Sequence, residues 1–376
     1  MEFKDKMNEK NTEDWEIKKI GNSLKLNYGK SLPETERKFG KVPVFGSNGV
    51  TGFHNNFLVK GPGIIIGRKG SVGEITFSEE DFWPIDTTYY LTKKDTELSL
   101  IFLYYKLLTL GINKMNSHAA VPGLNREDVY VINTRIPPLP EQQTIASILS
   151  SLDAKIELNN KMNKTLEAIG QAIFKKWFID ERKKEWKISK IGKELKTILG
   201  GTPDRTKSEY WNGNINWVNS GKVNEFRITE PSEKITELGL KKSATSLLPK
   251  GTVVLAITGA TLGQVSRLEI NSCANQSVIG ILENEKFSSE YLYYLIKNEI
   301  GEIIGFQTGG AQQHINKSNV DDFEIIIPDE KTLQNFNQLI KPIFHQISIN
   351  SFQSQTLSQI RDALLPKLMS GEIRIK

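Results

Sequence analysis

Cysteine, histidine and long apolar segments are scarce in this chain of 376 residues. Cys273 is the single cysteine, which excludes an internal disulfide and makes a cysteine-based zinc site implausible. The four histidines have no metal-ligand spacing with one another or with an acidic residue: His54, His118, His314 and His345. No apolar segment reaches membrane-spanning length, and the N-terminus lacks the apolar core of a signal peptide. We therefore expect a cytoplasmic protein with no metal site and no membrane contact.

Catalytic and nucleotide-binding signatures are missing as well. The glycine-rich segment 61–71 contains neither Gly-x-x-x-x-Gly-Lys-Ser/Thr nor Gly-x-Gly-x-x-Gly, so we interpret its glycines as turn residues between two strands. There is no Gly-x-Ser-x-Gly elbow. Residues 136–139 read Ile-Pro-Pro-Leu, which has the prolines of the amino-methyltransferase signature without its acid, amide or aromatic residue. We expect no catalytic centre in this chain.

The charge balance excludes little. With 49 Lys and Arg against 44 Asp and Glu, the net charge is +5. A mildly basic protein can bind nucleic acid, but many proteins with other functions carry as much charge.

The chain repeats itself on the scale of a whole domain. The segment from Trp15 to Gly21 returns from Trp186 to Gly192, 171 positions later. The shift has grown to 189 at Leu103-Tyr104-Tyr105 and to 191 at Leu124-Asn125. Such a repeat indicates one architecture built twice with different loops. Two similar modules that are not identical suggest a protein that recognises two different things at a fixed separation.

Each module contains short β-branched segments broken by glycine, which predict strands. The first module has predicted strands at 42–45, 63–67, 73–77 and 87–91, a helix at 100–110 and a closing strand at 129–132. The second has predicted strands at 216–218, 252–257 and 277–282, a helix at 290–297 and a closing strand at 323–327. Strands with few helices predict an α+β fold of two repeated mixed α/β modules.

A long helix is predicted after each module. Pro140 and Glu141 suit a helix start, and apolar residues then recur at steps of three, four and seven in both copies. Pro366 should kink or end the second helix. The expected division is a polar leader 1–13, a module 14–139, a helix 140–180, a module 184–328, and a helix 331–370 with a tail to 376.

The two helices are predicted to pack on each other as an antiparallel coiled coil, because neither can bury its apolar stripe against a small domain alone. Polar residues interrupt both stripes near the middle of each helix: Asn159 and Asn163 in the first, Asn350 and Ser354 in the second. Midpoints meet in an antiparallel pair, so we predict that these residues face each other and fix the register. The alternative is that they are surface residues beside a slightly different stripe.

Loops that mix cations, amides and small residues lie at matching positions of the two modules, 116–126 and 307–317. Such side chains bind base edges or phosphates. The DNA-binding candidates from these loops are Ser117, His118, Asn125, Arg126, Gln312, Gln313, His314, Asn316 and Lys317. Weaker candidates are the basic pairs Arg68, Lys69 and Arg205, Lys207, because isolated basic pairs usually lie on solvated surface. Polar turns that bind no ligand are the alternative for each loop.

These features together resemble the specificity subunit of type I restriction–modification enzymes. The resemblance rests on the opening Trp15 and Trp186 segments, on the long helix after each module, and on residues 136–143, Ile-Pro-Pro-Leu-Pro-Glu-Gln-Gln. Residues 364–373 are similar to the usual C-terminal segment of that family. The resemblance covers everything after the leader. The second copy departs from the pattern at 327–332, where only one proline remains.

The resemblance implies a non-catalytic DNA-binding scaffold. Each module would be a target recognition domain that reads one half of a bipartite, asymmetric site in double-stranded DNA. The helix pair would set the spacer length and dock two methylation (M) subunits, and restriction/motor (R) subunits would join them. The chain itself would bind no cofactor. The partner subunits would use S-adenosylmethionine for adenine methylation, together with ATP and Mg.

Two other functions fit the residues. One is a non-catalytic adaptor whose modules clasp a protein assembly through the coiled coil. The other is a divergent DNA methyltransferase, which should bind S-adenosylmethionine on its own.

Overall fold

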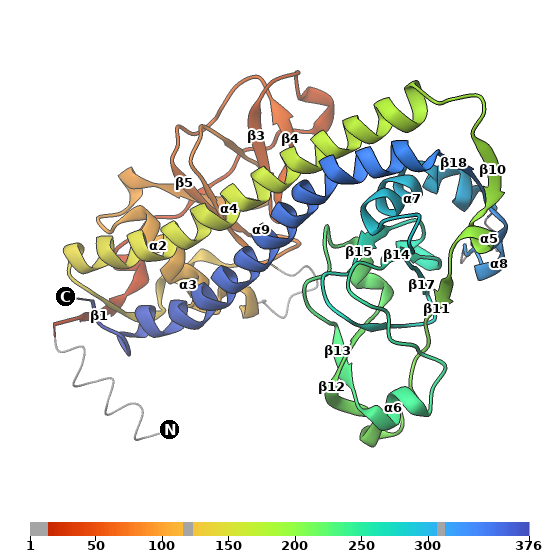
Figure 1. The fold of residues 1–376 in the computed structure, drawn as a ribbon. Coiled ribbons are helices and arrows are strands. Elements are labelled where there is room, and N and C mark those ends of the chain that lie inside the picture. The colour runs from red at the N-terminus through yellow and green to blue at the C-terminus, as the bar shows by residue number, and fades with distance from the viewer. Residues whose placement is uncertain (1–13, 116–122, 307–312, 376) are drawn as a thin grey trace. The chain divides into compact units, whose positions relative to one another are not determined.

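The computed structural model describes residues 14–115, 123–306 and 313–375. The predicted leader 1–13 and the candidates Ser117, His118 and Gln312 lie outside these residues. The chain forms two compact units (Figure 1). The first unit combines Met1–Lys155 with Leu357–Lys376, and the second is Ile156–Thr356. This division differs from the expected one because it passes through both long helices.

Short strands and one packed helix make up the globular part of the first unit. Its strands are β1 (Glu16–Lys19), β2 (Asn27–Tyr28), β3 (Val42–Gly46), β4 (Gly49–His54), β5 (Gly63–Gly67), β6 (Ile75–Ser78), β7 (Trp83–Pro84), β8 (Thr88–Thr92) and β9 (Asn133–Ile136). Its helices are α2 (Leu100–Leu108), α3 (Arg126–Tyr130), the start of α4 (Leu139–Lys175) and the end of α9 (Glu330–Ser370).

The second unit contains the corresponding elements. Its strands are β10 (Lys187–Lys190), β11 (Thr197–Leu199), β12 (Trp211–Val218), β13 (Glu233–Ile235), β14 (Val253–Ala256), β15 (Val265–Arg267), β16 (Cys273–Ala274), β17 (Val278–Ile281) and β18 (Glu324–Ile327). Its helices are the second half of α4, α5 (Ile191–Glu194), α6 (Glu237–Lys241), α7 (Ser289–Ile303), α8 (Lys317–Asp322) and most of α9 (Glu330–Ser370).

Both units have the same strand topology. The four-stranded sheet β2-β8-β5-β6 of the first unit corresponds to β11-β17-β14-β15 of the second, and the three-stranded sheet β4-β3-β7 to β13-β12-β16. The ribbon β1-β9 corresponds to β10-β18. Strand pairs are antiparallel except β3 with β7 and β12 with β16, which occupy the same place in the two units. The predicted α+β fold of two repeated modules is confirmed.

The predicted closing strand of the first module is wrong. Val129 lies in the short helix α3, and the strand that pairs with β1 is β9, which begins four residues after Val129. The reason is local, since the Asn125 side chain accepts a hydrogen bond from the backbone N–H of Glu127 and so caps a helix. A buried valine on a capped turn has the same apolar signature as a strand residue.

Pro366, which was expected to kink or end the second long helix, does not end it. Helix α9 continues to Ser370 and ends at Gly371, which has a left-handed φ of 76°. It also contains Pro342. A proline removes the donor to the carbonyl four residues earlier, here those of Gln338 and Asp362. Both of these residues are exposed, so water can replace the lost donor.

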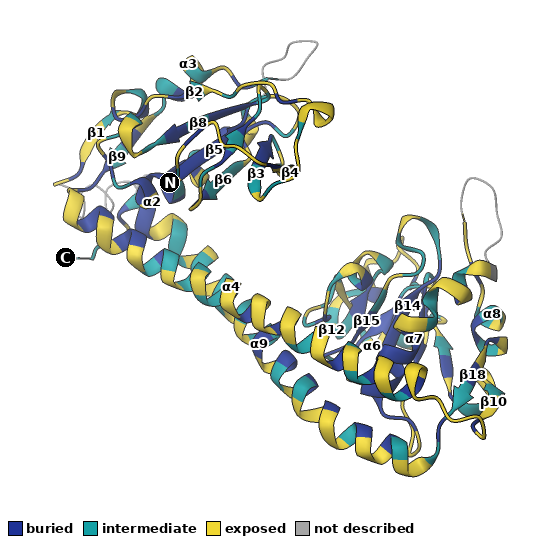
Figure 2. Ribbon diagram, turned by 90° about the horizontal axis from the view of Figure 1, so that it is seen from above, coloured by how far each residue is buried: buried dark blue, intermediate teal, exposed yellow. Residues whose placement is uncertain are grey.

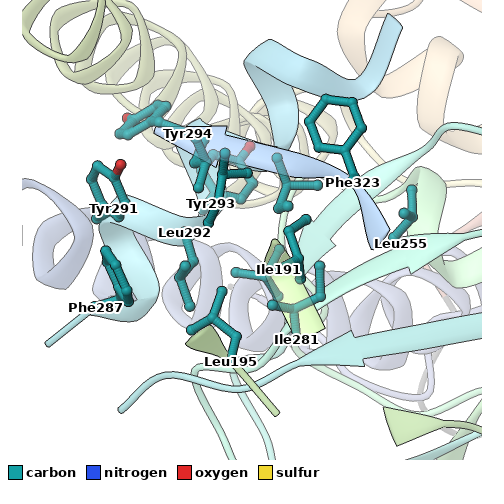
Figure 3. Packing of buried hydrophobic residues seen from close by; sticks show 14 of the residues in the cluster. Ile191, Leu195, Leu255, Ile281, Phe287, Tyr291, Leu292, Tyr293, Tyr294 and Phe323 are labelled. Carbon is teal, nitrogen blue, oxygen red and sulfur yellow. The ribbon is translucent and has the colours of Figure 1, made fainter. Parts of the chain in front are cut away.

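In each unit, one helix of the module packs on α4 and α9. In the first unit, Phe102 and Leu103 of α2 join Leu149 of α4 and Leu368 of α9 in one core. In the second, the aromatic face of α7 meets Phe174 of α4 and Phe336 of α9, and Figure 3 shows the tyrosines of α7 within this core. Figure 2 shows that many strand residues are buried, whereas both long helices carry exposed residues along their length.

Gly170, the one glycine inside α4, is required by this packing. A Cβ atom at this position would collide with the Tyr294 hydroxyl of α7. Glycine lowers helix stability by about 1 kcal/mol relative to alanine. Close contact between α4 and α7 compensates for that loss here.

Buried asparagines join the two long helices within the second unit. Asn163 Oδ1 accepts a hydrogen bond from Asn350 Nδ2 at 2.9 Å, and Asn159 Nδ2 donates to Gln353 Oε1 at 3.0 Å. The partner numbers fall along α9 as they rise along α4, so the predicted antiparallel packing is confirmed. Ser354 Oγ and Asn159 Oδ1 are buried with no hydrogen-bond partner among the described residues. That these residues fix the register stays a prediction.

Replacing Asn163 and Asn350 together with leucine should leave the free energy of unfolding unchanged or raise it, while allowing other registers. Buried asparagines in coiled coils select one alignment at some cost in stability. Spin labels on the exposed Lys164 and Lys341 would give one narrow distance in the native chain and a broader distribution in the double variant. Asn160→Leu, at an exposed neighbouring position, is the control. A distribution that stays narrow in the double variant would show that these amides do not select the register.

A buried network of charges ties both long helices to the core of the second unit. Arg227, whose side chain is 1% exposed, pairs with Glu167 of α4 at 3.2 Å and with Glu269 at 3.9 Å. Ser348 of α9 donates to Glu269 at 2.9 Å, and Tyr293 of α7 donates to Glu167 at 2.9 Å. Sequence periodicity gave no sign of this network, because it uses single residues from five separate segments.

Acid should loosen this network. Burial by itself raises the pKa of Glu167, but the charges of Arg227 and Lys297 lower that pKa overall. A carboxyl whose folded pKa lies below its unfolded pKa, about 4.3 for glutamate, stabilises the protein above that value and loses its effect as the pH falls through the folded pKa. We expect hydrogen exchange of α7 amides, corrected for intrinsic rates, to accelerate below about pH 4.3. In the Glu167→Gln variant, the α7 amides should exchange faster at neutral pH than in the native chain, and acid should accelerate their exchange less. An unchanged acid response in this variant would contradict the assignment.

Candidate nucleic-acid interface

The fold brings together two of the predicted basic segments of the first unit. Lys69 forms an isolated antiparallel bridge with Gly123, and the backbone N–H of Leu124 donates to the carbonyl of Arg68 at 2.8 Å. The turn after β5 therefore lies beside the start of α3. Arg68 and Lys69 come from one segment and Arg126 from the other, so three cations share one surface of this unit.

Tyr28, which the sequence analysis did not identify, is at the centre of this surface. Its ring is half exposed, and the guanidinium carbons of Arg68 and Arg126 lie 5.1 Å and 5.2 Å from its centroid. Tyr89 packs beside it with ring centroids 5.1 Å apart, and burial raises the pKa of Tyr89 to about 12. Contact with aromatic faces holds guanidinium groups in place while leaving their N–H donors available.

The cations of this surface are only partly neutralised. Arg126 pairs with its neighbour Glu127 at 3.2 Å in an exposed position. Arg68 donates to the backbone carbonyl of Asp86 at 3.0 Å and has no carboxylate within ion-pair distance among the described residues. A positively charged surface with oriented donors suits phosphate oxygens or the acceptor edge of a guanine. We call the group Tyr28, Arg68, Lys69 and Arg126 the arginine–tyrosine surface.

The second unit pairs the same two segments with different side chains. Thr258 bridges to His314, and the backbone N–H of Ile315 donates to the carbonyl of Ile257 at 3.0 Å. Gly259 N–H donates to the carbonyl of Gln313 at 3.0 Å. The positions of Arg68 and Lys69 are thus occupied by isoleucine and threonine, so the two units present different chemistry on one backbone arrangement.

The repeated asparagines at the start of α3 and α8 have structural roles. Asn316 accepts from the backbone N–H of Asn319 at 2.9 Å, and the Asn319 side chain accepts from the N–H of Asn316 in return. Asn125 caps α3 with a single bond, accepting from the backbone N–H of Glu127 at 3.2 Å. Lys317 pairs with Asp321 on the same helix. Capping therefore explains why these asparagines recur, and that Asn125, Asn316 and Lys317 contact DNA stays a prediction.

Arg205 and Lys207 lie beside the three-stranded sheet of the second unit, away from the segment pairing at the end of β14. The guanidinium carbon of Arg205 is 3.7 Å from the centroid of the Trp211 ring, and Arg205 pairs with Glu233 at 2.5 Å. Lys207 Nζ is 3.4 Å from the Tyr210 hydroxyl. Each candidate has a partner within its own unit, and their role in DNA binding stays a prediction.

The distinctive segment 136–143 holds the first unit together. Glu141 accepts from the indole N–H of Trp15 at 3.1 Å and receives two hydrogen bonds from Arg374, at 2.7 Å and 2.9 Å. In the second unit Asp329 takes this place, accepting from Trp186 at 3.0 Å and from Lys183 at 2.7 Å. Arg374 follows Lys183 by 191 positions, the shift of the repeat at that point.

The described residues contain neither a metal-binding cluster nor a membrane-spanning helix. No cluster of three or more histidine, cysteine, aspartate or glutamate residues could hold a metal ion within 14–115, 123–306 and 313–375. Within the same ranges, no helix combines the length and the apolar character needed to cross a membrane.

Comparison with known proteins gives a consistent result. Residues 12–168 and 183–361 match the type I restriction modification DNA specificity domain. The type I restriction enzyme MjaIX specificity subunit of Methanocaldococcus jannaschii is 25% identical, over 100% of this chain and 97% of that protein. The type I restriction enzyme HindI specificity subunit of Haemophilus influenzae is 24% identical over 67% of this chain and 71% of that protein.

The fold is also that of a solved relative. The crystal structure of a type I restriction-modification system S subunit from M. genitalium matches with a TM-score of 0.66 at 16% identity, covering 94% of this chain and 96% of that one. The match to the specificity domain in two successive copies coincides with the two modules of the repeat. This chain belongs to the type I restriction–modification specificity subunit family.

Proposed function

We propose that the chain is the DNA-recognition subunit of a type I restriction–modification complex, in which each unit reads one half of a bipartite, asymmetric site in double-stranded DNA. The observation that carries the proposal is the pairing of the same two segments in each unit with different side chains. One backbone arrangement with two sets of side chains suits two different half-sites.

The first unit would bind through the arginine–tyrosine surface, and the second through residues 313–317. Contacts to phosphates would supply affinity that falls with salt, and contacts to base edges would supply specificity. In the first unit, Lys69 suits phosphate as a mobile point charge, whereas the two arginines held against Tyr28 suit oriented contacts.

The chain would act without catalysis of its own. Methylation subunits would use S-adenosylmethionine, and restriction subunits would use ATP and Mg²⁺. Its membership in a family of DNA specificity domains supports this division of roles.

Footprinting of the chain with its methylation partner tests the proposal. We expect two protected blocks separated by an unprotected spacer, and methylome sequencing of a host carrying both subunits should give a two-part motif. One contiguous block would contradict the proposal. An adaptor would show no preference between DNA sequences, and a divergent methyltransferase would bind labelled S-adenosylmethionine as the isolated chain.

We further propose that α4 and α9 each dock one methylation subunit. Leu158, Met162 and Ile169 of α4 are 51%, 39% and 45% exposed and fall on one stripe of the helix. The repeat shift of 191 relates Leu158 to Ile349 and Ile169 to Ile360, which are 46% and 43% exposed. Apolar residues exposed at equivalent positions of both copies support two equivalent docking surfaces for two copies of one partner.

Adding positive charges to the exposed apolar stripe of α4 should prevent one of the two methylation subunits from binding. Leu158→Lys with Met162→Lys places two cations in the proposed contact. Losing central apolar contacts typically weakens binding by about tenfold or more, which is about 1.4 kcal/mol or more. Native mass spectrometry should then detect one bound methylation subunit in place of two. Asn160→Lys adds a charge on another face of α4 and should leave two bound. Full occupancy in the double variant would place the docking surface elsewhere.

A further inference from the structure

A cavity of about 500 Å³ in the first unit lies between α2, the ribbon β1-β9 and the C-terminal end of α9. Its lining includes two cations, Lys106 of α2 and Arg135 of β9. Thr109 and Asn133 add neutral polar groups, and Ile17 and Met369 add apolar walls. None of these residues belongs to the arginine–tyrosine surface or to the exposed stripe of α4.

Within residues 14–115, 123–306 and 313–375, neither cation has an anionic partner. Lys106 is 4% exposed, and its ammonium donates to the backbone carbonyl of Met369 at 2.8 Å. Burial, and then the charge of Arg135, lower the pKa of Lys106 to about 8. Among the described residues no carboxylate lies within ion-pair distance of Lys106 or Arg135. Two neighbouring cations without a counter-ion are unfavourable, since each raises the energy of the other.

The second unit shows that the fold does not need these cations. The positions equivalent to Lys106 and Arg135 are Leu295 and Ile326, and the corresponding cavity there measures about 60 Å³. The strand register is the same in both units, with Ile17 opposite Arg135 and Ile188 opposite Ile326. The same architecture is therefore built with two apolar residues at these positions.

Helix capping explains only part of the arrangement. The Met369 carbonyl lies in the last turn of α9, where a lysine donor is favourable. This contact accounts for Lys106. Among the described residues, Arg135 has no hydrogen bond to a carbonyl at the end of α9, and its charge lowers the pKa of Lys106. A negative group between the two side chains would offset their mutual repulsion.

We propose that this cavity is a binding site for a phosphate group, held between Lys106 and Arg135. A phosphate monoester carries close to two negative charges at neutral pH, which matches two cations better than a singly charged carboxylate does. Arginine can bind phosphate with two parallel hydrogen bonds, and lysine binds it as a point charge. The cavity exceeds the size of one phosphate, so Ile17 and Met369 leave room for an organic part of the ligand.

Calorimetric titration of the full chain with inorganic phosphate, and separately with adenosine monophosphate, tests the proposal at constant ionic strength. We expect saturable binding of phosphate and an upward shift in the pKa of Lys106, followed by NMR of its side chain. A tighter complex with the nucleotide would assign the site to an organic phosphate, and equal affinities would assign it to the free anion. Absence of saturable binding by both ligands would overturn the proposal.

Arg135→Ile gives the sharpest variant, because the second unit contains isoleucine at the equivalent position and the Lys106 cap is retained. We expect its phosphate affinity to fall about tenfold, the effect typical of one charged hydrogen-bonding partner. Arg182→Gln removes an exposed arginine of the second unit and should change nothing. Thermal unfolding without phosphate would verify that both variants are folded. Equal phosphate affinity in Arg135→Ile and the native chain would overturn the site.

Discussion

Replacing Arg227 with methionine should destabilise the second unit by about 3–5 kcal/mol, the effect of removing one partner from a buried ion pair. The substitution removes the buried cation that Glu167 and Glu269 share. Each carboxylate then keeps another close cation, Lys297 at 2.8 Å for Glu167 and Arg267 at 2.5 Å for Glu269. Methionine retains much of the side-chain volume, so the loss is mainly electrostatic. Hydrogen exchange of α7 amides would measure the change within the second unit.

The control for Arg227 is an exposed pair of the same unit. Lys190 and Asp322 lie 2.9 Å apart with both side chains more than half exposed, so Lys190→Met should change the stability far less than Arg227→Met does. Adding Glu167→Gln to Arg227→Met should recover part of the stability, because a largely buried carboxylate that has lost one of its two cations is then replaced by a neutral amide. Equal effects of Arg227→Met and Lys190→Met would mean that the buried network is not electrostatically important.

Replacing Arg68 and Arg126 with alanine should relax recognition in one half-site and leave the other half unchanged. This expectation rests on the proposed function of the arginine–tyrosine surface. A base contact by arginine typically contributes about 1–3 kcal/mol, so each residue should change discrimination by about ten- to a hundredfold. Methylation of a randomised site library by the reconstituted complex would show which positions lose their preference.

Lysine substitutions separate base contacts from phosphate contacts. If Arg126 binds a phosphate, Arg126→Lys should retain most activity, whereas a contact with two parallel hydrogen bonds to a base should be lost. Gln313→Ala, in the second unit, should affect only the other half-site. Equal loss of preference in both half-sites would contradict recognition by separate units.

The fold was largely predictable because the duplicated sequence shows the same order of apolar segments, turn glycines and long helices twice. Apolar strands such as β5 and β14 were identified from composition, and the long helices from their periodicity. Val129 was misassigned because a capping asparagine decides its conformation. The capping roles of Asn125 and Asn316 would follow from a repeated Asn before a helix start, a pattern that also fits an amide placed to bind a base.

The candidate site was less predictable, since its geometry depends on contacts between distant segments. Tyr28 lies in a strand of two residues, and its position beside Arg68 and Arg126 follows from pairing with β8. Lys106 is an ordinary residue in an amphipathic helix until its buried position and its neighbour Arg135 are known. In both cases, comparison of equivalent positions in the two copies is the sequence signal that could have drawn attention to them.

The composition of the first unit has a consequence for synthesis on the ribosome. Residues 156–356 contain the whole second unit, so it can fold as soon as Thr356 has emerged. The first unit needs residues 357–376 as well, including Arg374, which binds Glu141. The part of the protein that is translated first is therefore completed last. Until then, the apolar surfaces of Leu149 and Phe102 that later meet Leu368 remain open to chaperones or to a second nascent chain.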